Sequence, residues 1–239
     1  MSSIRVRFTR GDNVKFISHL DLMKLFERAL RRSGVPIAYS QGFNPHPQMV
    51  FGLPLSVGVT SEAEYADFDM AAPITPAEFR DKLNEQLPGG IEILEAVEKT
   101  SKGNIMASIS GAVYTVTVFL KESTALEELD KKVAGFVDKA EIIVKKEGKG
   151  GIKNVNIRPM IHKLEVYPAK SVPAGYGEFK TAFVLEALLG AGSVANLKPE
   201  LLLSAFSEYS GLETGAALIH RKELYVDYSG TMADPLKVV

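Results

Sequence analysis

The segment Ile4-Arg5-Val6-Arg7-Phe8 and the helix that follows it decide how this sequence folds. Apolar and basic residues alternate along the segment, which is the two-residue period of a half-buried β-strand. Ser18 and Asp21 have the spacing of a helix-capping box, and apolar residues then recur every three or four positions until Gly34 and Pro36 end the helix. We therefore predict a strand followed by an amphipathic helix.

The pattern continues outward as β-α-β-β-α-β over the first hundred residues. A second helix starts at Thr75-Pro76-Ala77-Glu78, where Thr is the N-cap and Pro occupies the first turn. The remaining elements are predicted from apolar runs and periodicity: strands at 49–53, 64–70, 91–97, 113–120, 141–145, 161–167, 178–187 and 218–226, and helices at 124–138 and 198–209.

This order, which roughly repeats after residue 110, predicts an α+β protein made of two tandem ferredoxin-like (βαββαβ) domains. Each domain would be an antiparallel sheet covered by helices. We expect an N-terminal domain at residues 1–100 and a C-terminal domain at 110–230. Residues 231–239 are expected to be a flexible tail, and residues 146–153 a loop rich in glycine and lysine.

Composition excludes several classes of site. The chain has 239 residues and no cysteine, so disulfides, thiolate zinc sites, cysteine nucleophiles and Cys-ligated iron–sulfur clusters are ruled out. It lacks a signal-peptide core and has no apolar run long enough to span a bilayer. We expect a cytoplasmic protein that makes no membrane contact.

Charge is balanced in total but unevenly distributed. The formal net charge is -1, yet residues 1–32 hold eight Lys or Arg against three Asp or Glu. The overall charge gives no support for a general nucleic-acid binder, and no DNA partner is expected. A locally basic element can nevertheless meet an anionic partner. Arg28, Arg31 and Arg32 lie on the polar side of the first helix and, with Arg5 and Arg7, are candidate phosphate contacts. The alternative is a solvated helix face.

Residues 40–48, Ser-Gln-Gly-Phe-Asn-Pro-His-Pro-Gln, form the most unusual stretch. It is uncharged, its histidine stands between two prolines, and glycine allows a left-handed backbone conformation. We interpret it as a preformed binding loop in which Gln41, Phe43, Asn44 and His46 contact a ligand. The alternative is a rigid turn with Phe43 buried beneath it.

Other candidates are less specific. His19 lies at a helix N-terminus, where it can contact phosphate or transfer a proton, or pack beside Asp21. Arg158, next to Pro159, can bind phosphate or carboxylate, or pair internally with an acidic residue. The histidine spacing predicts no metal site. Lysines form a second basic patch around three glycines, at positions 145, 146, 149 and 153.

Several motifs closely resemble the radical-SAM-linked protein family, a domain fused to, or encoded beside, a radical SAM protein. The resemblance covers most of the chain and is carried by Lys15-Phe16-Ile17-Ser18-His19-Leu20-Asp21, Arg28-Ala29-Leu30-Arg31-Arg32-Ser33-Gly34, Tyr39-Ser40-Gln41-Gly42-Phe43-Asn44-Pro45-His46-Pro47, Pro54-Leu55, Gly58, Glu64-Tyr65, Asn154-Val155-Asn156-Ile157-Arg158-Pro159, Leu201-Leu202 and His220-Arg221-Lys222-Glu223-Leu224-Tyr225. Two departures are Asn156, where the family tends to have Asp, and a longer stretch at 194–199.

The resemblance implies association with a radical SAM enzyme. Its frequent genomic neighbours of the ribonuclease G type imply a link to RNA. Because this chain has no cysteine, the iron–sulfur cluster and S-adenosylmethionine would be held by the partner, and this chain would bind no cofactor. We therefore expect a non-catalytic accessory module acting with a radical SAM enzyme in RNA-related modification or processing.

The alternative is an enzyme. RAMP-type CRISPR RNA-processing proteins also have tandem ferredoxin-like domains, and some cleave RNA with a histidine. By that analogy, this chain would be a metal-independent endoribonuclease with His19 or His46 as general acid or base. A small-ligand pocket lined by residues 40–54 is a third interpretation.

Overall fold

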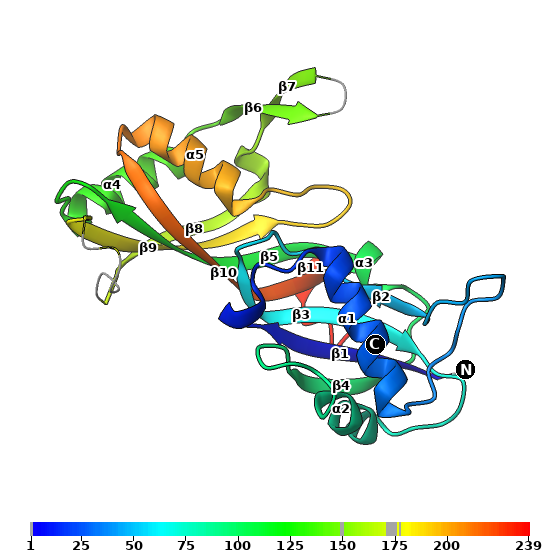
Figure 1. Ribbon diagram of the computed structural model, residues 1–239. Coiled ribbons are helices and arrows are strands. Elements are labelled where there is room, and N and C mark those ends of the chain that lie inside the picture. The colour runs from blue at the N-terminus through cyan, green and yellow to red at the C-terminus, as the bar shows by residue number, and fades with distance from the viewer. Residues whose placement is uncertain (1, 149–150, 171–175, 177) are drawn as a thin grey trace. The chain divides into compact units, whose positions relative to one another are not determined.

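The computed structural model of the protein describes residues 2–148, 151–170, 176 and 178–239 (Figure 1). The fold is mixed α+β, which confirms the predicted class. The chain divides into two compact units: Met1–Gly111 together with Arg221–Val239, and Ala112–His220. The strand expected to close the second domain therefore passes into the first unit at residue 221.

The first unit is an antiparallel sheet with two helices. Strands β1 (Ser3–Arg10), β3 (Thr60–Asp69) and β4 (Ile93–Lys99) lie in the order β4-β1-β3, and both β2 (Met49–Phe51) and β10 (Thr214–Tyr228) pair with β3. Helices α1 (His19–Ser33) and α2 (Pro76–Asn84) connect these strands, and α3 (Ile105–Ser108) is a single turn.

The core of the first unit lies between the sheet and the two long helices. Alternate residues of β1 and β3, among them Val6, Phe8 and Phe68, face the apolar sides of the helices, where Phe26 and Phe79 are fully buried. The rings of Phe8, Phe26 and Phe68 lie within a cluster of edge-on and tilted aromatic contacts. This packing fixes the orientation of α1, whose other side faces solvent.

The expected C-terminal tail is part of the first unit. Residues 231–233 form strand β11 against β10, and Leu236 is buried. The main-chain carbonyls of Pro235 and Val238 accept hydrogen bonds from Arg5, at 3.0 and 3.2 Å. The prediction of a tail was therefore wrong, because the segment covers the sheet face that carries Arg5.

The second unit repeats the element order with one insertion. Strands β5 (Ile109–Leu120), β8 (Ile161–Pro168), β9 (Thr181–Gly190) and β10 lie in the order β10-β5-β9-β8, with helices α4 (Leu126–Val137) and α5 (Pro199–Ser210). Phe136 of α4 packs edge-on against Phe206 of α5, with ring centroids 5.5 Å apart.

The insertion is a β-hairpin of β6 (Ile143–Gly148) and β7 (Gly151–Asn156). It replaces most of the loop expected at residues 146–153. Two of the residues predicted for that loop, 149 and 150, lie outside the described residues. Among the helices of the described part of the chain, none is long and apolar enough to cross a membrane.

Candidate functional site

The exposed side of α1 carries a row of cations, which we call the cationic ridge: Lys24, Arg28, Arg31 and Arg32. The helix begins as predicted, because the Ser18 hydroxyl accepts a hydrogen bond from the Asp21 amide at 3.2 Å and donates one to its carboxylate at 2.7 Å. The hydrogen bond from the Ser18 hydroxyl to the carboxylate lowers the pKa of Asp21. The helix ends at Gly34, whose φ of 66° is left-handed.

A groove of about 410 Å³ runs beside the ridge. Its sides are the ridge and the turn after α2, where Arg32 donates to the Gln86 carbonyl at 2.7 Å and to its side-chain oxygen at 3.3 Å. Charged groups line one side and apolar groups the floor: Ile17, Asp21, Lys24, Leu25, Arg28, Arg32, Gln86, Leu87 and Pro88. The cations at the edge of the groove can bind an anion, and its apolar residues can contact an apolar group.

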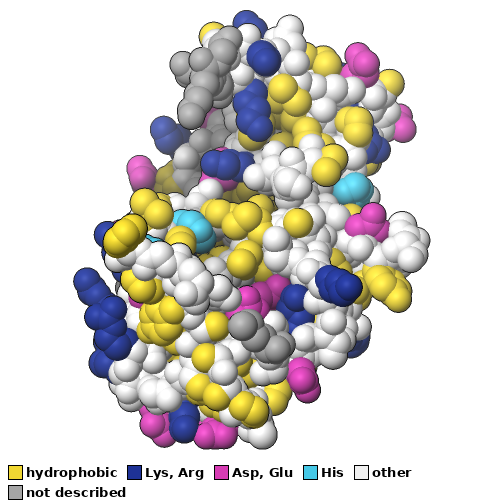
Figure 2. All heavy atoms as spheres, turned by 90° about the vertical axis from the view of Figure 1, so that its right-hand side faces the viewer, with side chains coloured by type: hydrophobic (Ala, Val, Ile, Leu, Met, Phe, Trp, Pro, Cys, Tyr) yellow, Lys and Arg dark blue, Asp and Glu magenta, His cyan; other side chains and the backbone are white. Residues whose placement is uncertain are grey.

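Figure 2 shows a column of Lys and Arg side chains beside hydrophobic ones on the face that it displays. Exposed hydrophobic residues flank the first turn of α1, where Phe16 is 73% and Leu20 68% exposed. The Lys15 ammonium lies 5.2 Å from the centre of the Phe16 ring. The surface thus combines positive charge with apolar and aromatic contact area.

The 40–48 loop is ordered by its own hydrogen bonds. The Ser40 amide donates to the His46 carbonyl at 2.9 Å, and the His46 amide donates to the Ser40 hydroxyl at 3.0 Å. The Gln48 amide donates to the Ala38 carbonyl at 2.8 Å, and Gly42 adopts a φ of 135°. The interpretation of a preformed loop agrees with these contacts.

Phe43 stands fully in solvent, with a relative exposure of 112%. The alternative in which it is buried under the turn was therefore wrong. Gln41, Asn44 and His46 are exposed as well. The loop reaches α1 through His46, whose Nδ1 lies 3.7 Å from a carboxylate oxygen of Glu27.

The two candidate catalytic histidines are not brought together. The His19 ring packs edge-on against Phe51, with centroids 5.8 Å apart, and burial lowers its pKa, helped by the nearby Arg10 charge. His46 lies beside Glu27, which is about 12 Å further along the helix axis from His19. Arg28 faces the groove, on the side of α1 opposite His19. The described residues contain no group of three or more His, Asp or Glu suited to a metal ion.

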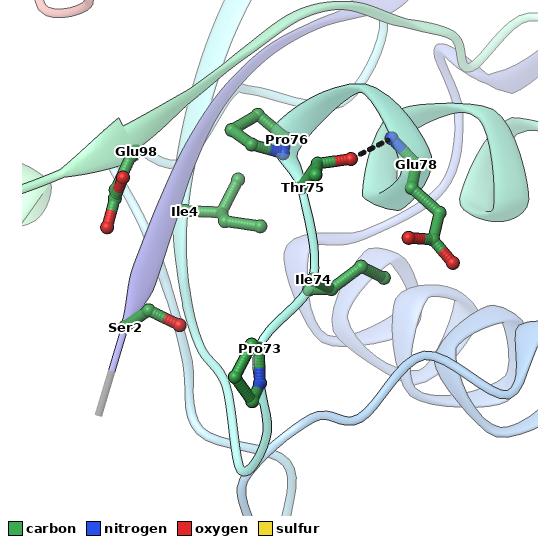
Figure 3. Close-up of a pocket in the computed structure, with 8 residues that line it drawn as sticks. All are labelled: Ser2, Ile4, Pro73, Ile74, Thr75, Pro76, Glu78 and Glu98. Atoms are coloured by element: carbon green, nitrogen blue, oxygen red, sulfur yellow. Dashed lines mark hydrogen bonds between the residues drawn. The ribbon is translucent and has the colours of Figure 1, made fainter.

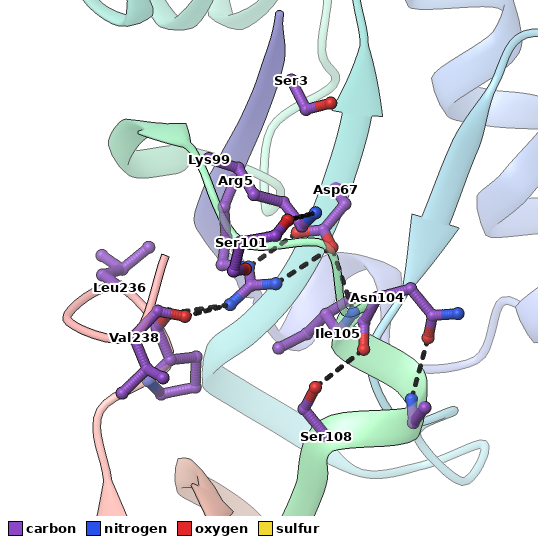
Figure 4. Close-up of polar contacts among 12 residues, drawn as sticks. Ser3, Arg5, Asp67, Lys99, Ser101, Asn104, Ile105, Ser108, Leu236 and Val238 are labelled. Atoms are coloured by element: carbon purple, nitrogen blue, oxygen red, sulfur yellow. Dashed lines mark hydrogen bonds and ion pairs between the residues drawn. The ribbon is translucent and has the colours of Figure 1, made fainter. Parts of the chain in front are cut away.

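Arg5 and Arg7, considered as phosphate contacts, are instead used inside the first unit. Arg5 is buried and makes a two-pronged ion pair with Asp67, at 2.7 and 3.0 Å (Figure 4). Arg7 lies between Glu223, at 3.2 Å, and Glu95, at 3.7 Å. Both faces of this sheet are covered, so the charged side chains of Arg5 and Arg7 pair with residues of the same unit.

Arg158, predicted as a binding residue, also has an internal role. Its guanidinium donates to the carbonyl of Val137 at 2.7 Å and to that of Ile161 at 3.0 Å. Val137 is the last residue of α4, whose terminal carbonyls lack partners within the helix. The role found is thus internal, but the partners are main-chain carbonyls and not the acidic residue that the internal alternative expected.

Two further buried arginines hold the segment before α1 and the segment after β2. Arg10 donates to the carbonyls of Val14, Lys15, Ile17 and Leu55. Arg221 pairs with Glu64 at 2.9 Å and donates to the carbonyl of Leu53 at 3.1 Å. They fix the two segments that carry Phe16 and the residues after β2. Their sequence signal is weak, since each stands in an ordinary strand pattern.

A second cavity, of about 380 Å³, lies at the N-terminal end of α2 (Figure 3). Its wall is apolar and its rim carries two glutamates: Ser2, Ile4, Pro73, Ile74, Thr75, Pro76, Glu78 and Glu98. The first turn of α2 is already capped, because Thr75 accepts from the Glu78 amide at 3.2 Å. The negative rim makes this cavity unsuited to a phosphate ligand.

Comparison with solved structures finds two chains that are similar to this one. A protein of a "Cbf5-Nop10-Gar1 Complex" matches with a TM-score of 0.53 at 10% identity, over 92% of this chain and 47% of that one. A second, from an "H/ACA RNP bound to a substrate RNA containing 2'-deoxyuridine", has a TM-score of 0.43 at 12% identity, over 96% of this chain and 47% of that one. This chain thus spans just under half the length of both. No curated protein matches it.

The family comparison covers most of the sequence. A family model described as "Uncharacterized protein conserved in bacteria (DUF2344)" matches residues 3–199. That range contains α1, the 40–48 loop and strands β1, β3 and β4 of the first unit. The chain therefore belongs to the bacterial protein family DUF2344.

Proposed function

We propose that the protein is a non-catalytic binding module that holds RNA against the cationic ridge and the 40–48 loop. The observation that carries this proposal is a pre-ordered loop with a fully exposed aromatic ring, joined to a helix whose cations face solvent. Among the described residues, Arg28 and Arg31 form no ion pair or hydrogen bond through their side chains. Their charge is therefore available to a ligand.

The chemistry of this surface suits a nucleic acid strand. Lys and Arg contact phosphates without reading sequence. Phe43 can stack on an unpaired base, and the amides of Gln41 and Asn44 can hydrogen-bond to base edges. Because the loop is already closed by hydrogen bonds, little ordering of the loop would oppose binding.

We further propose that the module acts with a radical SAM enzyme in the modification or processing of that RNA. The support is the resemblance carried by residues 15–21, which lead into the first turn of α1, and by residues 39–47, which include most of the 40–48 loop. The cluster and S-adenosylmethionine would belong to the partner, since this chain has no thiolate ligand. Co-purification with a radical SAM protein from the native host is the expected result. Failure to recover one would contradict this part.

For the fold we propose two ferredoxin-like domains in tandem. The support is the strand order, since β4-β1-β3-β2 in the first unit and β10-β5-β9-β8 in the second both follow the order 4-1-3-2 of their own strands. In this interpretation the β6–β7 hairpin is an insertion between the first helix and second strand of the second domain.

The test is a salt-dependent titration with single-stranded RNA. We expect Arg28→Gln combined with Arg31→Gln to weaken binding by about tenfold near 0.1 M salt, and to lower the slope of log K against log salt by about 1.4. The matched control is Arg80→Gln with Lys82→Gln. These two cations on α2 already pair with Asp81 and Glu78. Equal effects of the two variants, or no binding by the wild type, would contradict the proposal.

The enzymatic alternative assigns His19 or His46 as general acid or base. Burial lowers the pKa of His19, which favours the neutral imidazole that can accept a proton. The decisive measurement is incubation of the pure protein with labelled RNA between about pH 5 and 8. We expect the RNA to remain intact. Cleavage that is lost on His19→Gln would replace the binding module by an endoribonuclease.

A further inference from the structure

The hairpin β6–β7 places two positive charges directly opposite each other. Lys146 of β6 is in register with Lys153 of β7, and both side chains are exposed. Directly opposed residues in an antiparallel pair have Cβ atoms about 5 Å apart and point to the same face. Among the side chains that the structure describes, none forms an ion pair with either lysine.

This pairing works against the stability of the hairpin. Like charges directly opposite on a sheet repel, and lysine is depleted from strands in general. The next pair on the same face, Gly148 and Gly151, adds no side chain that separates the charges. A pair that costs stability in the free protein is explained most simply by a ligand that neutralises it.

The hairpin is anchored at its base only. Val144 is buried, the Ile157 amide donates to the Ile142 carbonyl at 2.8 Å, and the Asn156 side chain accepts from the Ile142 amide at 3.0 Å. Beyond these residues β6 and β7 pair only with each other among the described strands, and the hairpin extends away from α4 and α5 (Figure 1). The opposed lysines therefore lie on a projecting two-stranded ribbon that is accessible on both faces.

The charge of the ribbon favours a polyanion. Residues 143–156 contain four lysines and one glutamate, although Lys149 lies outside the described residues. Lys145 is exposed on the face opposite the lysine pair. A phosphodiester backbone carries one fixed charge per nucleotide at close spacing, which matches two neighbouring ammonium groups better than the separate carboxylates of an acidic protein surface do.

We propose that the β6–β7 hairpin is a second RNA-contact surface, in which Lys146 and Lys153 hold consecutive phosphates of the backbone. The choice of RNA rests on the proposed function, but the contact itself belongs to the second unit and does not use the cationic ridge. It reads no base sequence, because ammonium groups contact phosphate as point charges.

The test is the same titration with a single-stranded oligouridine. We expect Lys146→Thr with Lys153→Thr to reduce affinity by about tenfold near 0.1 M salt and to lower the salt slope by about 1.4, which is the value for two phosphate contacts. Threonine suits a strand and removes the repulsion, so the midpoint of thermal unfolding should not fall. Weaker binding without loss of stability is the signature of a ligand site.

The matched control is Lys132→Gln with Lys163→Gln, which removes two lysines of the same unit that already pair with Glu128 and Glu165. An unchanged affinity in the hairpin variant would overturn the inference while leaving the proposed function intact. Reduced affinity in the hairpin variant, with unchanged affinity in the Arg28 and Arg31 variant, would overturn the proposed function and leave this inference intact. Wild-type binding to an acidic peptide but not to RNA would overturn both.

Discussion

Arg5 and Asp67 form a buried ion pair whose cost and benefit can be separated by mutation. Both side chains are almost fully removed from solvent, and Asp67 also accepts a hydrogen bond from the Ile105 amide at 3.0 Å. We expect Arg5→Met to lower the free energy of unfolding by about 3–5 kcal/mol, because it leaves a carboxylate buried without its partner. Denaturant unfolding measures this loss.

The control for Arg5→Met is Arg80→Met, which breaks a solvent-exposed pair with Asp81 and should leave the free energy of unfolding almost unchanged. Adding Asp67→Asn to Arg5→Met should recover part of the stability, since the amide carries no charge. If the double variant is less stable than Arg5→Met alone, the loss in Arg5→Met does not come from an unpaired Asp67 carboxylate.

His19 gives the protein a dependence on pH. Burial, with the Arg10 guanidinium nearby, holds the pKa of His19 below its ordinary value of 6.5. The unfolded chain therefore takes up this proton at a higher pH than the folded chain, so the free energy of unfolding falls as the pH drops below about 6.5.

We expect His19→Gln to lose less stability than the wild type between about pH 7.5 and 5.5 in urea unfolding. His162→Gln is the control, because it replaces an exposed histidine of the second unit in the same way. Parallel profiles for the wild type and His19→Gln would rule out this titration.

At the scale of the element, α1 depends on its first turn. The Ser18 hydroxyl satisfies the Asp21 amide, which has no partner within the helix. We expect Ser18→Ala to cost about 1 kcal/mol in unfolding free energy, and Thr75→Ala, which removes the equivalent cap of α2, to cost a similar amount. A loss below a few tenths of a kcal/mol in both would show that tertiary packing alone sets these helix ends.

The helix caps and most strands could be predicted from the sequence because their signals are local. The Thr75-Pro76 start and the Gly34 stop each lie within a few residues of the backbone groups that they satisfy. The hairpin at 143–156 could be predicted only in its first residues, within the strand expected at 141–145, since the lysines and glycines that follow disfavour a strand and only the register with the partner strand stabilises them. The period of two along β1 predicts a strand with one solvent-exposed face, yet Arg5 on that face is buried.

At the scale of the whole molecule, what covers that face is a segment remote in sequence. The hydrogen bond from Arg5 to the Val238 carbonyl joins residues 233 positions apart, and the periodicity of neither segment predicts this contact. The candidate site likewise combines residues that the local sequence pattern predicts with residues that it does not predict. Its cations follow from the helical period of α1, whereas the opposite side of the groove comes from Gln86, 54 residues beyond Arg32.

The C-terminal segment should therefore stabilise the first unit selectively. A chain ending at Ala233 loses buried Leu236 and the two carbonyls that accept from Arg5, which should cost about 3 kcal/mol or more. We expect amide hydrogen exchange to show lower protection in β1 and β3, while β8 and β9 keep theirs because they belong to the second unit. Lys237→Ala, which alters an exposed side chain in the same segment, should leave both regions unchanged. Equal loss of protection in all four strands would mean that the two units unfold as one, and no loss in β1 would mean that the segment does not stabilise the sheet that it covers.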